Sequence, residues 1–103
     1  MKHRIGDFEL DVEQRSLTGP NKTELLPETL FRILLLLIAA RGEVVTREQL
    51  IANVWDNGFV TDATITQHVF RLRKLLNADG ADVPYIVTEP GQGYRLNAII
   101  IVA

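Results

Sequence analysis

The chain has 103 residues, no cysteine and a formal net charge of −2 at pH 7. This length is enough for one domain with a single hydrophobic core, and the lack of cysteine excludes a disulfide framework and a thiolate metal site. The slightly acidic balance is unusual for a nucleic-acid binder, which generally carries excess Lys and Arg for phosphate contacts. If DNA is the partner, the basic residues must be concentrated on one face.

Residues 1–103 are expected to form one domain without a membrane-spanning or secretory segment. The longest apolar run, residues 33–40, is much shorter than the ~20 residues that a spanning helix needs. No apolar segment follows the basic start of the chain, as it would in a secretory signal. We therefore expect a cytoplasmic protein, and a link to a membrane would require a segment that this chain does not contain.

Residues 4–25 have the pattern of short antiparallel strands. Phe8, Leu10 and Val12 alternate with acidic residues, which is typical of a strand with one buried face. The turn-forming sequence Thr-Gly-Pro-Asn follows at residues 18–21. The sequence therefore predicts a small N-terminal sheet that ends near Leu25.

A core of three helices is predicted over about residues 27–77. The first helix begins at Pro27, because the first helical turn tolerates proline. It is apolar almost all round, which is typical of a central core helix, and Gly42 is its expected C-terminal cap. A short strand is expected at residues 43–45.

The second and third helices carry recognisable start signals. Thr46 and Gln49 have the spacing of a capping box, in which each side chain bonds the other residue's backbone N–H. Thr61 or Asp62 is expected to cap the third helix. That helix should end near Leu76, before the turn-forming residues 77–80.

The third helix has a face that could read DNA. Four apolar residues at helical spacing predict its buried stripe: Ile65, Val69, Leu72 and Leu76. The remaining polar, basic or aromatic positions are Thr64, Thr66, Gln67, His68, Phe70, Arg71, Arg73 and Lys74. No acidic residue lies among them, so the positive charge is local. In the major groove, Arg pairs with guanine and Gln with adenine. Alternatively, the basic residues only stabilise the negative C-terminal end of the helix.

The end of the chain is predicted to form a hairpin over about residues 84–97. Two β-prone runs, residues 85–88 and 94–96, flank a turn that contains Gly91 and Gly93. Gly93 is expected to need a backbone angle that branched residues avoid. Two helices joined by a short turn and followed by a hairpin predict a winged helix-turn-helix. The fold class is thus α+β, with a short N-terminal antiparallel sheet, three helices and a C-terminal β-hairpin wing.

Three motifs in this order resemble the OmpR/PhoB-type effector domains. The segments are TREQLIANVW at residues 46–55, FRLRKLL at 70–76 and GQGYRL at 91–96. They are similar to the second helix, the end of the recognition helix and the wing of that family. The resemblance spans about residues 5–97 with the spacings preserved.

Residues 66–67 and 85–90 most resemble the ToxR/CadC branch of this family. In that branch the DNA-binding domain comes first in the chain, and here Met1 lies directly before the first expected strand. The resemblance implies sequence-specific binding of double-stranded DNA by a bacterial transcription regulator. The third helix would enter the major groove, and the wing would lie at the adjacent minor groove.

The resemblance also implies which residues make contacts. The DNA contacts would come from the outward residues of the third helix and from two residues at the wing tip. These are Thr64, Thr66, Gln67, His68, Phe70, Arg71, Arg73 and Lys74 of the helix, and Gly91 and Gln92 of the wing. The loop before the third helix would contact RNA polymerase through Asp56, Asn57, Gly58 and Phe59. Members of the family also bind DNA in tandem or as homodimers.

The competing prediction is a winged helix that binds another protein and has little DNA affinity of its own. Its support is the wing tip at residues 90–92, which carries no Arg or Lys, and the aromatic Phe70 at an outward position. An enzyme is not expected. His3 and His68 are the two histidines, and no pair of carboxylates has the spacing of a catalytic acid and base. The sequence predicts no metal site and no cofactor.

Overall fold

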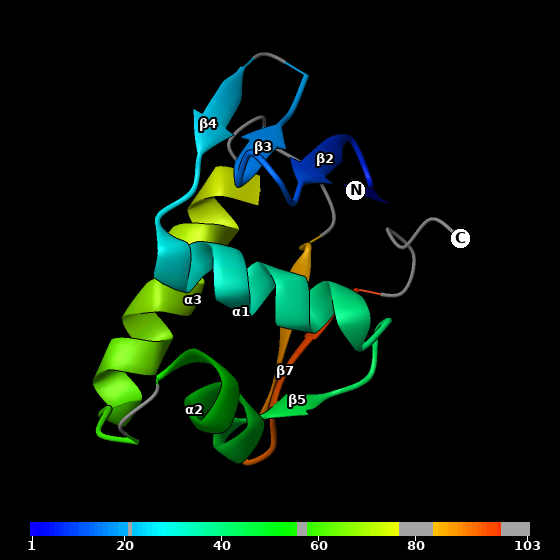
Figure 1. The fold of residues 1–103 in the computed structure, drawn as a ribbon. Coiled ribbons are helices and arrows are strands. Elements are labelled where there is room, and N and C mark those ends of the chain that lie inside the picture. The colour runs from blue at the N-terminus through cyan, green and yellow to red at the C-terminus, as the bar shows by residue number, and fades with distance from the viewer. Residues whose placement is uncertain (21, 56–57, 77–83, 98–103) are drawn as a thin grey trace.

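The structure is a computed structural model, and it describes residues 1–20, 22–55, 58–76 and 84–97. A four-stranded sheet, three helices and a three-stranded sheet follow one another in these residues, so the predicted winged helix-turn-helix class is confirmed (Figure 1). The elements are β1 (Lys2–Ile5), β2 (Phe8–Asp11), β3 (Ser16–Thr18), β4 (Thr23–Leu25), α1 (Glu28–Ala39), β5 (Val45–Thr46), α2 (Arg47–Val54), α3 (Asp62–Leu76), β6 (Ile86–Glu89) and β7 (Gly93–Leu96).

The N-terminal sheet is antiparallel, in the order β1-β2-β3-β4. Phe8 and Leu10 of β2 are buried and Glu9 is half-buried, as the alternating pattern predicts. β1 starts at Lys2, two residues before the expected start of the sheet, because Lys2 pairs with Asp11 across the β1–β2 ladder. The polar sequence at residues 2–4 gave no periodic signal for this strand.

Helix α1 crosses the middle of the molecule (Figure 1). Its buried side chains join one hydrophobic core that also takes in residues of both sheets and of the other two helices. The buried residues of α1 are Leu30, Phe31, Ile33, Leu34 and Leu37. Pro27 is the N-cap, so the helix begins one residue later than predicted.

The C-terminal end of α1 differs from the expected glycine cap. Ala40 is the C-cap, and Arg41 takes the left-handed conformation with a φ of 51° before Gly42 does so with a φ of 88°. The Arg41 N–H still donates to the carbonyl of Ile38 at 3.1 Å. The predicted helix end was one residue too late, because Arg41, which is not a glycine, is the first residue to take the left-handed conformation. The strand that follows is likewise later than predicted, at Val45–Thr46.

The predicted capping box at the start of α2 is confirmed. The Gln49 N–H donates to the Thr46 hydroxyl at 3.1 Å, and the Thr46 N–H donates to the Gln49 side-chain oxygen at 2.9 Å. Both bonds satisfy donors that the first helical turn leaves unpaired. The box therefore fixes the point at which β5 passes into the helix.

We expect Thr46→Ala to lower the free energy of unfolding by about 1 kcal/mol, because alanine cannot accept the Gln49 N–H. Chemical denaturation followed by circular dichroism measures this loss. Thr66→Ala is the matched control, since Thr66 lies exposed within α3, where alanine is the better helix former. An equal loss in both variants would contradict the assigned role of the cap.

The C-terminal hairpin is confirmed and forms part of a three-stranded sheet in the order β5-β7-β6. β5 pairs with β7 through Val45↔Tyr94 and Thr46↔Gly93. This pairing attaches the hairpin to the start of α2. The expected helix-ending residues 77–80 lie outside the described residues, as does Asn21 of the predicted N-terminal turn.

Tyr85 connects the N-terminal sheet to the hairpin. Its hydroxyl accepts a hydrogen bond from the Asp7 N–H at 3.1 Å, and its ring meets Phe8 edge-on at 5.5 Å between centroids. Gly6, with a φ of 56°, lies so close that an added Cβ would be 2.3 Å from the Tyr85 hydroxyl. The two sheets therefore share a closely packed contact.

Candidate nucleic-acid interface

Helix α3 buries one stripe and exposes the opposite face, as predicted. Ile65, Val69, Leu72 and Leu76 are all buried. The predicted site residues that remain exposed on the helix are Thr66, Gln67, Phe70, Arg71 and Lys74. Asp62 is the one acidic residue of α3, and Arg47 pairs with its carboxylate at 2.6 Å. The exposed face therefore keeps its basic character.

Arg71 is the most available cation on this face. It is exposed, and within the described part of the chain no hydrogen bond or ion pair involves it. Its guanidinium has five N–H donors in a fixed planar arrangement. Such a group can pair with a guanine edge or a phosphate without breaking a contact inside the protein.

Phe70 and Lys74 lie one helical turn apart and contact each other. The Lys74 ammonium lies 4.9 Å from the centroid of the Phe70 ring, a cation–π arrangement. Phe70 is 54% exposed. The outward aromatic ring of Phe70 therefore contacts a basic side chain, so this face of α3 presents an apolar group and a positive charge side by side.

Thr64 and His68 are half-buried and bond within the protein. The Thr64 hydroxyl lies 2.9 Å from that of Thr61, whose oxygen also accepts the Thr64 N–H at 3.1 Å and so caps α3. The His68 Nδ1 lies 2.8 Å from the Thr64 carbonyl oxygen. Its ring meets Trp55 edge-on at 5.6 Å. These residues join α3 to the end of α2, a role that the sequence did not assign to Trp55.

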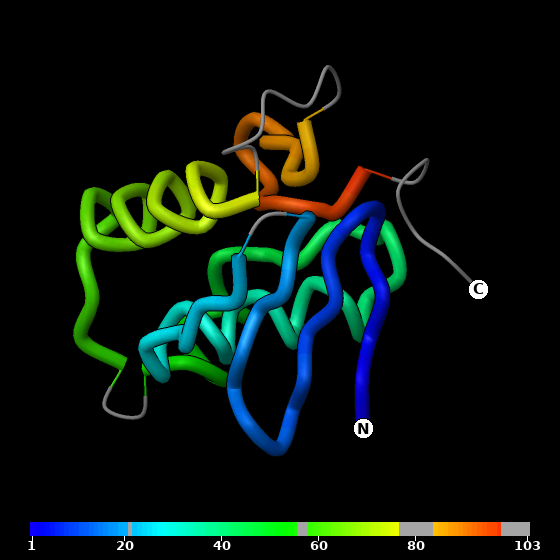
Figure 2. The backbone as a smooth tube through the Cα atoms, turned by 90° about the horizontal axis from the view of Figure 1, so that it is seen from above, coloured from blue at the N-terminus to red at the C-terminus, as the bar shows by residue number. Residues whose placement is uncertain are grey.

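Arg73 reaches the wing. Its Nε donates to the Ile86 carbonyl at 3.2 Å, and its Nη2 donates to the Thr88 hydroxyl. The guanidinium also lies 6.0 Å from the centroid of the Tyr94 ring. Figure 2 shows the hairpin beside the C-terminal half of α3. Arg73 therefore connects the two elements of the candidate interface, through partners 13 and 15 residues away in the chain that no local sequence signal marks.

We expect Arg73 and Thr88 to be energetically coupled. Arg73→Ala and Thr88→Val should each destabilise the protein, and the double variant should lose less than the sum, by about 1 kcal/mol. Denaturant titration of the four proteins measures this double-mutant cycle. Strict additivity would show that the contact contributes nothing to the position of the wing.

The wing tip is exposed and carries no free cation. Gly91 has a φ of 75°, and the Gln92 N–H donates to the Glu89 carbonyl at 3.0 Å, which closes the turn. Arg95, lower on the hairpin, pairs with Glu89 at 3.6 Å. The tip thus offers backbone groups and the Gln92 amide, but no net positive charge.

The predicted polymerase loop is only partly described. Asp56 and Asn57 lie outside the described residues. Gly58 adopts a φ of 71°, and Phe59 is 86% exposed. The described half of the loop therefore presents an aromatic side chain at the surface.

The described residues were compared with the requirements of a membrane-spanning helix and of a metal site. No helix there is long and apolar enough to cross a membrane. In the same ranges, no three carboxylate or imidazole side chains come together as metal ligands.

Residues 21–96 match the protein family described as "Transcriptional regulatory protein, C terminal". The chain is 32% identical over 101 residues to the transcriptional regulator HilA of Salmonella typhimurium, which covers 98% of this chain and 18% of the relative. The chain thus spans about a fifth of the length of this curated relative. The OmpR/PhoB-type resemblance is confirmed.

Two solved structures are similar along almost the whole chain. The DNA-binding domain of Escherichia coli CadC superposes with a TM-score of 0.81 at 30% identity, covering 94% of each chain. The Klebsiella pneumoniae RstA DNA-binding domain, solved in complex with the RstA box, has a TM-score of 0.75 at 26% identity, covering 94% of this chain and 97% of that one. The similarity to CadC agrees with the predicted branch.

Proposed function

The chain belongs to the OmpR/PhoB-type family of transcriptional regulatory protein C-terminal domains, and from this premise we propose that it binds double-stranded DNA sequence-specifically as part of a bacterial transcription regulator. We further propose that residues 1–103 form one domain, which the core shared by both sheets and all three helices supports. α3 would enter the major groove, and the wing would lie at the neighbouring minor groove.

The observation that carries this proposal is the exposed face of α3 beyond Asp62, which holds an arginine without a partner among the described residues. Arg71 and Gln67 lie one helical turn apart and both are exposed. An arginine and a glutamine at this spacing can each make two hydrogen bonds to a base edge. The overall charge of −2 does not oppose this interpretation, because the one acidic residue of α3, Asp62, lies in its first turn and is paired with Arg47.

We propose a division of roles among the predicted site residues. We assign base contacts to Gln67 and Arg71, phosphate contacts to Thr66 and Lys74, and a thymine methyl contact to Phe70. Gly91 and Gln92 would approach the minor groove through backbone and amide groups. Thr64, His68 and Arg73 would act by holding α3 and the wing in position, because their side chains bond within the protein.

Binding to another protein is the second candidate function. The exposed aromatic ring of Phe59 favours it, since an exposed apolar side chain on a loop is a suitable contact for RNA polymerase. Contact through Gly58 and Phe59 is compatible with DNA binding, because these residues precede the first turn of α3, whereas Arg73, which contacts the wing, lies in its last turn. Binding in tandem or as a homodimer on DNA belongs to the same proposal.

The test is selection of duplexes from a random pool, followed by a competition assay. We expect the protein to enrich one motif and to bind it at least about a thousandfold more tightly than unrelated duplex, as specific DNA readers do. Fluorescence anisotropy with a labelled selected duplex and unlabelled competitors measures this ratio. Equal competition by selected and unrelated duplexes would contradict sequence-specific binding.

A further inference from the structure

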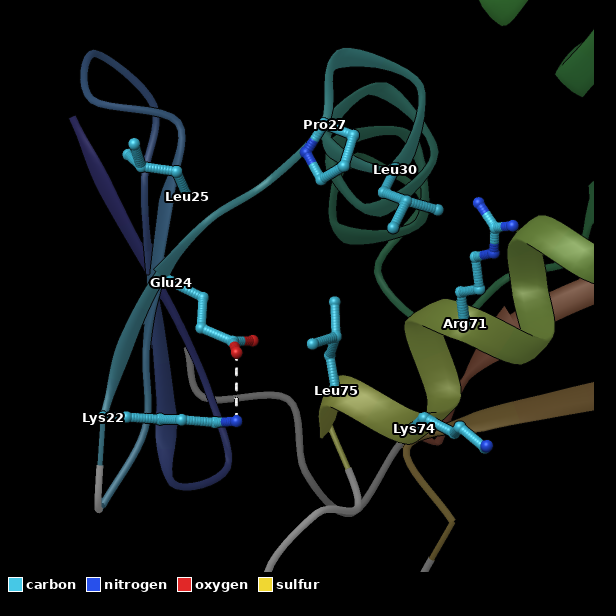
Figure 3. Close-up of a pocket in the computed structure, with 8 residues that line it drawn as sticks. All are labelled: Lys22, Glu24, Leu25, Pro27, Leu30, Arg71, Lys74 and Leu75. Atoms are coloured by element: carbon cyan, nitrogen blue, oxygen red, sulfur yellow. Dashed lines mark ion pairs between the residues drawn. The ribbon is translucent and has the colours of Figure 1, made fainter.

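A groove of about 720 Å³ runs between β4, the start of α1 and the last turns of α3 (Figure 3). Its lining residues are Lys22, Glu24, Leu25, Pro27, Leu30, Arg71, Lys74 and Leu75. β4 is an edge strand, since it pairs only with β3 in the N-terminal sheet. The groove therefore follows a strand whose outer edge has no partner among the described residues.

Apolar groups form much of the groove. Leu30 is buried at its base, Leu75 is half-buried, and Leu25 is 76% exposed. A partner that covers a leucine this exposed lowers the free energy, because apolar surface is removed from water. Nucleic acid does not supply such a cover, because its backbone is charged and hydrated along its length.

The charged groups of the groove are mostly positive. Lys22, Arg71 and Lys74 line the groove together with one carboxylate, Glu24, so three positive charges and one negative charge leave a local charge of +2, against −2 for the whole chain. Glu24 pairs with Lys22 at 3.0 Å. This pairing leaves Arg71 and Lys74 without a carboxylate partner within the described residues.

We propose that this groove binds an extended segment of a partner protein in which carboxylate and large apolar side chains alternate. The backbone would lie along β4, the apolar side chains would cover Leu25 on one side of this strand, and the carboxylates would pair with Arg71 and Lys74 of α3 on the other (Figure 3). Alternation suits this groove, because successive side chains of an extended segment point to opposite sides.

The groove and the proposed DNA face share Arg71. A segment that pairs with this guanidinium competes with DNA for it, so docking in the groove would reduce DNA binding. This consequence rests on the proposed DNA-binding function, whereas binding of the segment itself does not. The two are therefore tested in separate titrations.

The first titration uses a fluorescein-labelled octapeptide of alternating Leu and Glu, with no DNA present. We expect saturable binding, measured by anisotropy, which Leu25→Ser weakens at least about fivefold through loss of apolar contact. A peptide of alternating Ser and Glu controls for charge alone. The groove proposal is overturned if the Leu–Glu peptide does not bind, if the Ser–Glu peptide binds equally well, or if Leu25→Ser has no effect.

The second titration measures duplex DNA binding with and without unlabelled Leu–Glu peptide. We expect the peptide to raise the concentration of protein needed for half-saturation in the wild type and much less in Leu25→Ser, whose affinity for DNA alone should be unchanged. Peptide binding that leaves DNA affinity unaltered would overturn the competition. If the wild-type protein does not bind the duplex even without the peptide, that result would instead count against the proposed DNA-binding function.

Discussion

Gly93→Ala is expected to lower the free energy of unfolding by about 3 kcal/mol and to detach the wing from β5. A Cβ at residue 93 would lie 2.0 Å from the carbonyl oxygen of Val45 and 2.9 Å from the Cα of Thr46. Both neighbours are backbone atoms, so no side chain can turn aside to make room. The close passage of two strands therefore explains the glycine, together with the positive φ of 158° that agrees with the backbone angle expected from the sequence.

Gly91→Ala is the matched control for this variant. Gly91 has a φ of 75°, but a Cβ there would meet nothing within 4 Å. We expect a loss of about 1 kcal/mol from the left-handed conformation alone. Urea denaturation followed by tryptophan fluorescence compares the two variants, and equal losses would show that contact with β5 does not determine the residue at position 93.

Arg71→Ala is expected to weaken binding to a selected duplex by about 2 kcal/mol and to relax the preference for one base pair. The folded protein should keep its stability, because Arg71 is exposed and unpaired among the described residues. Lys74→Ala is the comparison, since a phosphate contact should weaken binding to all duplexes about equally.

Anisotropy titrations of both variants against the selected duplex and its single-base substitutions distinguish these outcomes. A base contact predicts that Arg71→Ala flattens the affinity profile at one position, while Lys74→Ala lowers every affinity by a similar factor. If Arg71→Ala binds the selected duplex as tightly as the wild type, Arg71 is not at the interface.

The elements with a strong local signal could be predicted from the sequence. The buried stripe of α3 follows from helical periodicity, the capping box at Thr46 from the spacing of two residues, and the two-stranded wing from two β-prone runs that flank a glycine-containing turn. The pairing of β5 with β7 could not be predicted, because it joins residues nearly fifty positions apart along only two residues of strand. The left-handed Arg41 was missed because nothing in its side chain indicates that conformation.

The candidate site shows the same distinction. Helical spacing correctly placed Gln67, Phe70 and Arg71 on the exposed face of α3. It could not separate the residues that remain free from those that bond within the protein. Arg73 turns to the wing and His68 packs on Trp55, because their partners are brought close by the tertiary fold and not by the helix itself. A helical projection assigns a side chain to a face, but its partners depend on the neighbouring elements.

The salt dependence of binding to the selected duplex tests the central proposal most directly. Lys74 is the exposed cation of the α3 face to which we assign a phosphate contact, and each such contact contributes about −0.9 to the slope of log K against log salt concentration. Anisotropy titrations between about 50 and 200 mM salt should therefore give a slope of about −1 or steeper. A slope near zero, or no binding at the lowest salt concentration, would contradict the account of this chain as a DNA-binding domain.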